Sequence, residues 1–233
     1  MKFIESRKFI IGFAAVALVF AVSAHDTQAQ NAATDKLEAA VELFYKASEL
    51  SGEEAIAIHD EIDRRFGRDD NPVIQEVVAR SLYAKGWELN AQGKQEKAIA
   101  AYDEVARRFG RHDAPAILEQ VINAQSDAAE AALILGRNQN AIQRAKAVQA
   151  RVGSSPVGAI MSFIIWLAEP NAPLQSVQKA IQDVESDEAF NWSFKEVSPV
   201  IAKLPDVYRK QAECFVGYFE EPDTDELNAC LEE

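Results

Sequence analysis

The sequence repeats itself at a fixed interval of 43 residues, and this interval is the feature that most constrains its fold. The segment 62–68, Ile-Asp-Arg-Arg-Phe-Gly-Arg, recurs at 105–111 with five of its seven residues identical. Matches extend on both sides of this segment, and a degraded third copy follows at the same offset up to Gly153. Periods of about 20–50 residues are typical of stacked supersecondary units. We therefore expect three repeats within residues 37–153.

Each repeat reads as a pair of helices. Asn71 and Pro72 suit the N-cap and the first position of a helix, and apolar residues follow at helical spacing up to residue 91. Gly93 breaks this helix, and the stretch 95–109 restarts the helical pattern. Since no segment after the N-terminal leader is rich in β-branched residues with alternating polarity, the sequence predicts an all-α fold.

The second repeat resembles the tetratricopeptide repeat (TPR) family. The resemblance rests on the stretch Leu82–Leu89, with Gly86 at the small eighth position where paired helices touch, and on Tyr102 in the second helix. Ala129 matches Gly86 in the third repeat, whereas His59 departs from the aromatic pattern. A small residue also stands early in each second helix, at Ala55, Ala98 and Ala141. The period departs from the usual length of about 34 residues.

The resemblance implies a right-handed superhelix of helical hairpins whose concave face binds peptides or partner proteins, without catalysis. Candidate partner-binding residues on the first helices are Lys85, Asn90 and Asn123. The larger aromatic side chains are expected in the core because they stand at helical spacing; they are Phe66, Tyr83, Trp87, Tyr102 and Phe109.

Arginines recur at the ends of the second helices, at residues 64, 65, 68, 107, 108, 111 and 151. One hypothesis is a basic stripe for an anionic partner. We favour compensation of the helix dipole together with pairing to Asp69, Asp70 and Asp113.

The N-terminal residues 1–24 have the pattern of a secretory signal peptide. A basic start is followed by an uncharged apolar run, 9–22, and then by Ser23 and Ala24, small residues that suit cleavage. The alternative is an uncleaved inner-membrane anchor, but the run is short against the roughly 20 residues needed to span a bilayer. We expect cleavage, a flexible N-terminus over 25–36, and a periplasmic or secreted protein without a stable membrane span.

The C-terminal part, 154–233, departs from the period and is expected to form a helical cap on the array. It contains an apolar helix over 157–168, and an aromatic segment over 187–198 that is either a short extended piece or a hydrophobic plug. Cys214 and Cys230 are the only two cysteines. Export favours a disulfide between them, and the alternative is two reduced thiols packed as small apolar groups.

Few features point to chemistry. A formal net charge of −13 argues against a nucleic-acid binder, which needs cations to displace counterions from phosphates. We expect His59 to replace the repeat aromatic in packing, and His112 to be a solvated turn residue. No zinc spacing, phosphate-binding loop or nucleophile signature is present, so we expect no metal, no cofactor and no enzymatic activity.

The leading interpretation is therefore an exported, periplasmic TPR scaffold that binds a protein or peptide and assembles or supports a cell-envelope complex. One alternative is a small-molecule or enzymatic role in a pocket between the repeats and the C-terminal cap, near Trp192. Another is self-association through the apolar helix containing residues 160–167.

Overall fold

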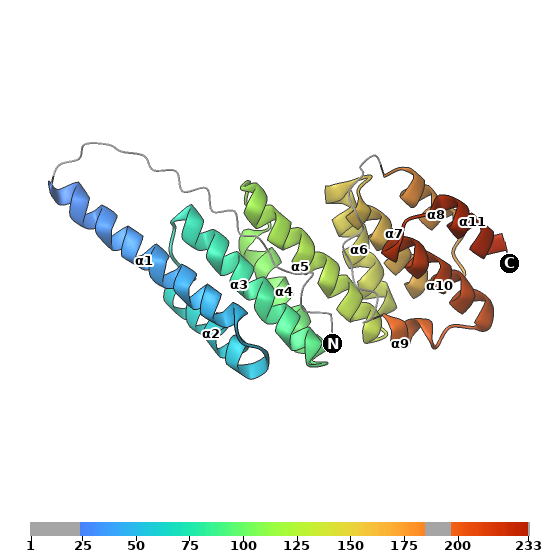
Figure 1. Ribbon diagram of the computed structural model, residues 1–233, viewed down its shortest axis with the longest axis horizontal. Coiled ribbons are helices and arrows are strands. Elements are labelled where there is room, and N and C mark those ends of the chain that lie inside the picture. The colour runs from blue at the N-terminus through green and yellow to red at the C-terminus, as the bar shows by residue number, and fades with distance from the viewer. Residues whose placement is uncertain (1–23, 185–196, 233) are drawn as a thin grey trace. The chain divides into compact units, whose positions relative to one another are not determined.

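The computed structural model describes residues 24–184 and 197–232, and within these ranges the chain consists of helices and contains no strand. The helices are α1 (Ala24–Ser48), α2 (Gly52–Phe66), α3 (Pro72–Ala91), α4 (Gln95–Phe109), α5 (Pro115–Ile134), α6 (Asn138–Val152), α7 (Pro156–Ala168), α8 (Gln175–Gln182), α9 (Ser198–Ile201), α10 (Asp206–Glu220) and α11 (Thr224–Glu232). From α2 to α8, and again from α9 to α11, helices that follow one another in sequence pack together (Figure 1). The predicted all-α solenoid is confirmed.

The first helix continues through residues 25–36, for which the sequence predicts a flexible N-terminus. This stretch lacks Gly and Pro and is rich in Ala, the residue with the highest helix propensity, which favours helix over coil. The chain divides into two compact units between Lys36 and Leu37, and the packing described below is that of residues 37–233. Of the predicted signal peptide 1–24, all but Ala24 lies outside the described residues.

The 43-residue period sets the helix boundaries. The second helices α2, α4 and α6 begin at Gly52, Gln95 and Asn138, in steps of 43, and each has 15 residues. The first helices α3 and α5 begin at Pro72 and Pro115 and each has 20 residues. The nine residues beyond a usual repeat therefore lengthen the helices and the links between hairpins.

The links before α3 and α5 are held by equivalent hydrogen bonds. Asn71 caps α3 as predicted, since its side chain accepts from the backbone N–H of Val73 at 2.9 Å. Asp69 Oδ1 accepts from the N–H of Asn71 at 3.0 Å, and His112 Nδ1, one period later, accepts from the N–H of Ala114 at 3.1 Å. His112 is thus a turn residue that keeps the acceptor role of Asp69.

The hairpins stack through their first helices. α3 packs on α5 and α5 on α7, while α4 packs between α3 and α5 and α6 between α5 and α7. Gly86 of α3 lies directly against the ring of Tyr102 of α4, and Tyr102 is fully buried. The small residue predicted at the helix contact is therefore confirmed by packing.

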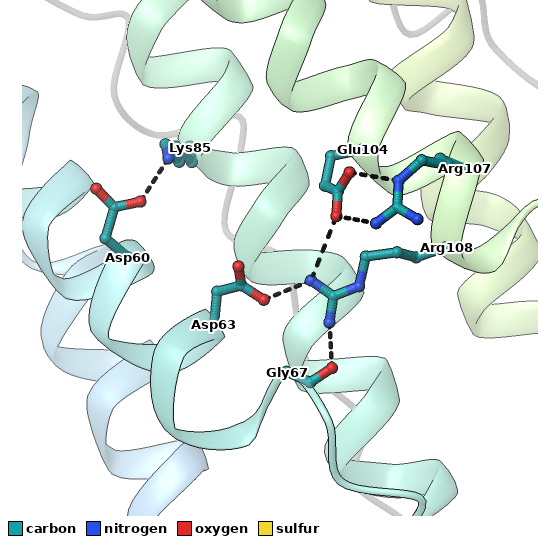
Figure 2. Close-up of polar contacts among 7 residues, drawn as sticks. All are labelled: Asp60, Asp63, Gly67, Lys85, Glu104, Arg107 and Arg108. Carbon is teal, nitrogen blue, oxygen red and sulfur yellow. Dashed lines mark hydrogen bonds and ion pairs between the residues drawn. The ribbon is translucent and has the colours of Figure 1, made fainter.

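Two of the arginines at the ends of the second helices, Arg108 and Arg151, join successive hairpins through partners other than the predicted aspartates. Arg108 of α4 binds the carboxylate of Asp63 in α2 and donates to the carbonyl of Gly67 just beyond α2 (Figure 2). Arg151 likewise donates to the carbonyl of Gly110 at 3.1 Å. Asp63 of α2 lies within reach of the Arg108 guanidinium of α4. Asp69 instead accepts a hydrogen bond from the backbone N–H of Asn71 in its own turn.

The apolar helix α7 takes the place that a fourth first helix would have. It packs on both α5 and α6, as α5 packs on α3 and α4, and α8 packs back on α7. Seven side chains between Ile160 and Ala168 are at most 5% exposed. The apolar surface considered for self-association is therefore buried within the chain.

The C-terminal helices complete the apolar cluster around α7. Phe215 and Phe219 of α10 pack on Phe163, with ring centroids 5.7 and 5.6 Å apart. Cys214 of α10 and Cys230 of α11 form a disulfide, with Cα atoms 5.8 Å apart, so the predicted pairing is confirmed. Most of the aromatic segment 187–198 lies outside the described residues.

Candidate functional site

The first helices carry a stripe of polar and aromatic side chains. On α3 this stripe consists of Glu76, Arg80, Tyr83, Trp87 and Asn90, which are spaced by three or four residues and are all half-buried or exposed. One period later, α5 carries Glu119, Asn123 and Ser126 at corresponding positions, whereas Glu130, one period after Trp87, is buried. We call these two stripes, on helices that pack together, the first-helix face.

Trp87 is the most exposed aromatic side chain of this face, and here the sequence prediction of a core residue is wrong. Its side chain is 42% exposed, while Phe66, Tyr102 and Phe109 are buried as predicted. Gly86 makes the contact with α4, and a helix turns by about 100° per residue, so the next side chain is rotated away from that contact. The sequence signal for this exposure was the position of Trp87 directly after Gly86, the small residue at the helix contact.

Large apolar side chains are exposed on other helices as well. Tyr45 of α1 is 46% exposed, Val73 of α3 is 38% exposed and Val207 of α10 is 66% exposed. Isolated exposed apolar residues need no functional explanation, so these three residues do not by themselves mark a binding surface.

The three predicted partner-binding residues do not form one group. Asn90 and Asn123 belong to the first-helix face and are half-buried. Lys85 lies on the side of α3 that meets the second helices, because its ammonium group forms an ion pair with Asp60 of α2 (Figure 2). Lys85 and Asn90 are five residues apart and so point in directions about 140° apart on the helix.

Two carboxylates lie near the buried hydroxyl of Tyr102, behind the first-helix face. Burial, and then the charges of Asp127, Tyr83 and Glu130, raise the pKa of the Tyr102 hydroxyl well above its usual value. The Tyr83 and Tyr102 rings lie 5.9 Å apart, which joins the face to the core. Glu130 is only 4% exposed. Glu130 is therefore shielded from solvent, and these carboxylates act on the core hydroxyl of Tyr102.

His59 takes the position of the repeat aromatic, as predicted. It is 4% exposed, its Nδ1 lies 2.9 Å from Ser81 Oγ, and its ring centroid lies 6.3 Å from that of Phe44. Burial is the main cause that lowers the pKa of His59 to about 4, so its imidazole is neutral at pH 7. The side chain packs and accepts or donates one local hydrogen bond rather than forming a chemical site.

Other site types find little support in the described part of the chain. Within residues 24–184 and 197–232, no group of three or more His, Cys, Asp or Glu side chains is arranged to hold a metal ion. No described helix has the length and apolarity needed to cross a membrane. The junction between repeats and cap is apolar where it is described, with Ile142, Val148, Phe163 and Trp166 in one cluster. Trp192 lies outside the described residues.

Comparisons with known proteins add no functional assignment. No protein-family model matches the chain, and no curated protein and no solved structure matches it. The first-helix face therefore stands on the geometry of this chain alone.

Proposed function

We propose that the chain is an exported scaffold of the TPR type that binds a protein or peptide on its first-helix face, and that it assembles or supports a cell-envelope complex. The observation that carries this proposal is the exposed Trp87, one turn from Tyr83 and in line with Asn90, on a layer of first helices in direct contact. Aromatic residues at the centre of a surface are the side chains that most often dominate protein binding.

The charges around the face favour a partner segment that combines apolar and basic residues. Asp127 and Glu130 lie close enough to Tyr102 to perturb its hydroxyl, and Arg80 is neutralised by Glu76 at 3.0 Å. A Lys or Arg of the partner would gain from the half-buried Asp127 and from the face of Trp87. An apolar side chain of the partner, next to that Lys or Arg, would cover the indole ring of Trp87.

Export is supported by two independent features. The segment 1–24 has the order of charged, apolar and small residues that signal peptidase substrates share. The disulfide between Cys214 and Cys230 is typical of an oxidising compartment. We place the protein in the periplasm, or outside the cell, on these grounds.

Site-specific photo-crosslinking tests the binding face. A photoreactive phenylalanine analogue replaces Asn90 in one variant of the full chain and Ala57, exposed on α2, in a matched control. In envelope extracts we expect discrete crosslinked proteins from position 90 that disappear when Trp87→Ala is added. Equal products from both positions, or none from position 90, would contradict the proposal.

A further inference from the structure

The second helices α4 and α6 lie on either side of an open gap. Both helices pack on α5, and they do not pack on each other in the way that the first helices α3 and α5 do. Between them lies a hollow of about 710 Å³, lined by Ile99 and Asp103 of α4 and by Arg144 of α6. An adjoining hollow of about 290 Å³ reaches inward to Gln125 of α5. Space and mainly polar side chains therefore separate the two helices.

Three arginines reach across this gap from α6. They are Arg137, at the N-cap of α6, Arg144 and Arg151. Their regular spacing corresponds to about two helical turns, so the three side chains share one side of the helix. In this order they bind the carboxylate of Glu96, the carboxylate of Asp103 at 2.6 and 3.0 Å, and the carbonyl oxygen of Gly110 at 3.1 Å. We call these three arginines the arginine seam.

The ion pairs of the arginine seam are open to solvent. The side chains of Glu96 and Asp103 are 59% and 50% exposed, and that of Arg137 is 49% exposed. Ion pairs at such exposure contribute little to stability and are screened by dissolved salt. A rise in ionic strength therefore weakens the bridge across the gap, whereas the apolar packing of α4 and α6 on α5 does not depend on charge.

The contact between α5 and α6 lacks the large side chain that locks the preceding hairpin. In that hairpin the ring of Tyr102 lies directly against Gly86. One period later the corresponding residues are Ala145 and Ala129, which are both fully buried. Methyl groups form low ridges, so two helices that meet through alanines can turn or slide with little repacking, as in the shear motions of packed helices.

The gap itself arises where polar residues replace apolar ones of the second repeat. Gln125 stands one period after Leu82, which is 3% exposed in the core. Arg144 stands one period after Ala101, which is also buried. The joint between the second and third repeats is therefore held by polar contacts at positions where the preceding repeat is closed by apolar ones.

We propose that the gap between α4 and α6 is a hinge of the array, in which α6 turns about α5 and the arginine seam holds the closed position. The closed state has the ion pairs across the gap, and the open state has the same groups hydrated. Because α7 packs on α6, it follows this motion. Since α5 and α7 both belong to the layer of first helices, opening changes the curvature of that layer. The hinge is a property of the chain itself and does not depend on the proposed binding face.

Distance measurements between pairs of spin labels on the full chain test the hinge. The native cysteines are joined in a disulfide, so only introduced cysteines take up a label. The pair Ala100→Cys and Gln143→Cys spans the gap, and the pair Ala57→Cys and Ala100→Cys occupies the same exposed positions one period earlier.

The salt concentration is raised so that the Debye length falls from about 30 Å to about 3 Å. We expect the distance between labels at 100 and 143 to lengthen by about 2 Å or more, the scale of helix shifts in switching proteins. The distance between labels at 57 and 100 should stay unchanged within error. Equal lengthening of both distances would overturn a hinge localised at this gap.

Variants separate the arginine seam from a general effect of salt. Arg137→Ala combined with Arg144→Ala should give, at low salt, the longer distance across the gap. Arg107→Ala serves as the matched control, because this arginine is 70% exposed and pairs within its own helix, so it should leave the distance unchanged. Circular dichroism checks that each variant keeps its helix content.

A third label pair distinguishes hinging from separation of the hairpins. Val73→Cys and Glu119→Cys place labels on α3 and α5, at exposed positions of the first helices. Their distance should not change with salt. Lengthening of this distance as well would mean that the hairpins come apart, and an unchanged distance between 100 and 143 in both high salt and the double variant would mean a rigid joint. Either result would overturn the hinge, and neither bears on crosslinking at position 90.

Discussion

Gly86 of α3 lies so close to Tyr102 of α4 that a Cβ atom on Gly86 would overlap the ring carbons Cδ1 and Cε1. Tyr102 is fully buried and has no room to withdraw. We therefore expect Gly86→Ala to lower the free energy of unfolding by about 1–3 kcal/mol, the usual cost of overpacking. Urea unfolding followed by circular dichroism measures this change.

Gly217 provides the matched control for that substitution. It lies within α10, and a Cβ added there meets no atom within 4 Å. Gly217→Ala should raise the free energy of unfolding by about 0.5–1 kcal/mol, because alanine restricts the unfolded chain and favours helix. If both substitutions changed stability in the same direction, helix propensity rather than the contact with Tyr102 would dominate.

The architecture was predictable because each period of the sequence corresponds to one helical hairpin. Steps of 43 residues between Gly52, Gln95 and Asn138 follow from repeated Gly and Pro positions that end or start helices. The partners of Arg108 were not predictable, because they depend on how adjacent second helices lie. Sequence distance favoured the nearby Asp113 over Asp63, which is 45 residues away.

Arg108 and Arg107 are adjacent in sequence, yet we expect opposite results from removing them. The Arg108 side chain is 16% exposed and links α4 to Asp63 and to the carbonyl of Gly67, whereas Arg107 is 70% exposed and pairs with Glu104 in its own helix (Figure 2). Arg108→Ala should cost about 1–3 kcal/mol of stability, since a charge-assisted bond to a helix end is lost.

Arg107→Ala should leave the urea midpoint unchanged within error, because an exposed pair within one helix contributes little. A second test uses salt: the difference between the two variants should persist at 0.5 M NaCl if the Arg108 contacts are shielded from solvent. Equal effects of the two substitutions would contradict the linking role of Arg108.

The candidate site was less predictable than the fold. The sequence could place Asn90 and Asn123 on the first helices, but the direction of Lys85 depends on Asp60 of the neighbouring helix. Trp87 was wrongly predicted to lie in the core. Helical spacing shows that apolar side chains share one side of a helix, but it does not show whether that side is buried.

The disulfide between Cys214 and Cys230 should matter mainly to the last helix. Among the contacts between described helices, α11 packs chiefly on α10, with Leu227 buried in the adjoining core. Replacing both cysteines by serine should cost up to about 3 kcal/mol for a loop of this length. In hydrogen exchange we expect faster exchange over residues 224–232 and unchanged exchange in α4; faster exchange throughout would instead indicate that the cap stabilises the whole array.

The buried His59 predicts a loss of stability on mild acidification. Its pKa is about 4 in the folded chain and about 6.5 when unfolded, so the unfolded state binds the proton first as the pH falls. The contribution of neutral His59 is complete above pH 6.5 and declines as the pH falls towards 4. Between pH 6.5 and 5 the loss should approach 2 kcal/mol.

Asp60 opposes this shift and Lys85 adds to it, but burial is the largest cause, so conservative removal of the titrating group is the direct test. His59→Phe restores an aromatic at the repeat position and cannot take up a proton. Urea unfolding of both proteins at pH 7, 6 and 5 should give a stability difference that changes by more than 1 kcal/mol across this range. Parallel curves for the two proteins would mean that His59 is protonated without cost, and that its surroundings are more accessible to water than its 4% exposure indicates.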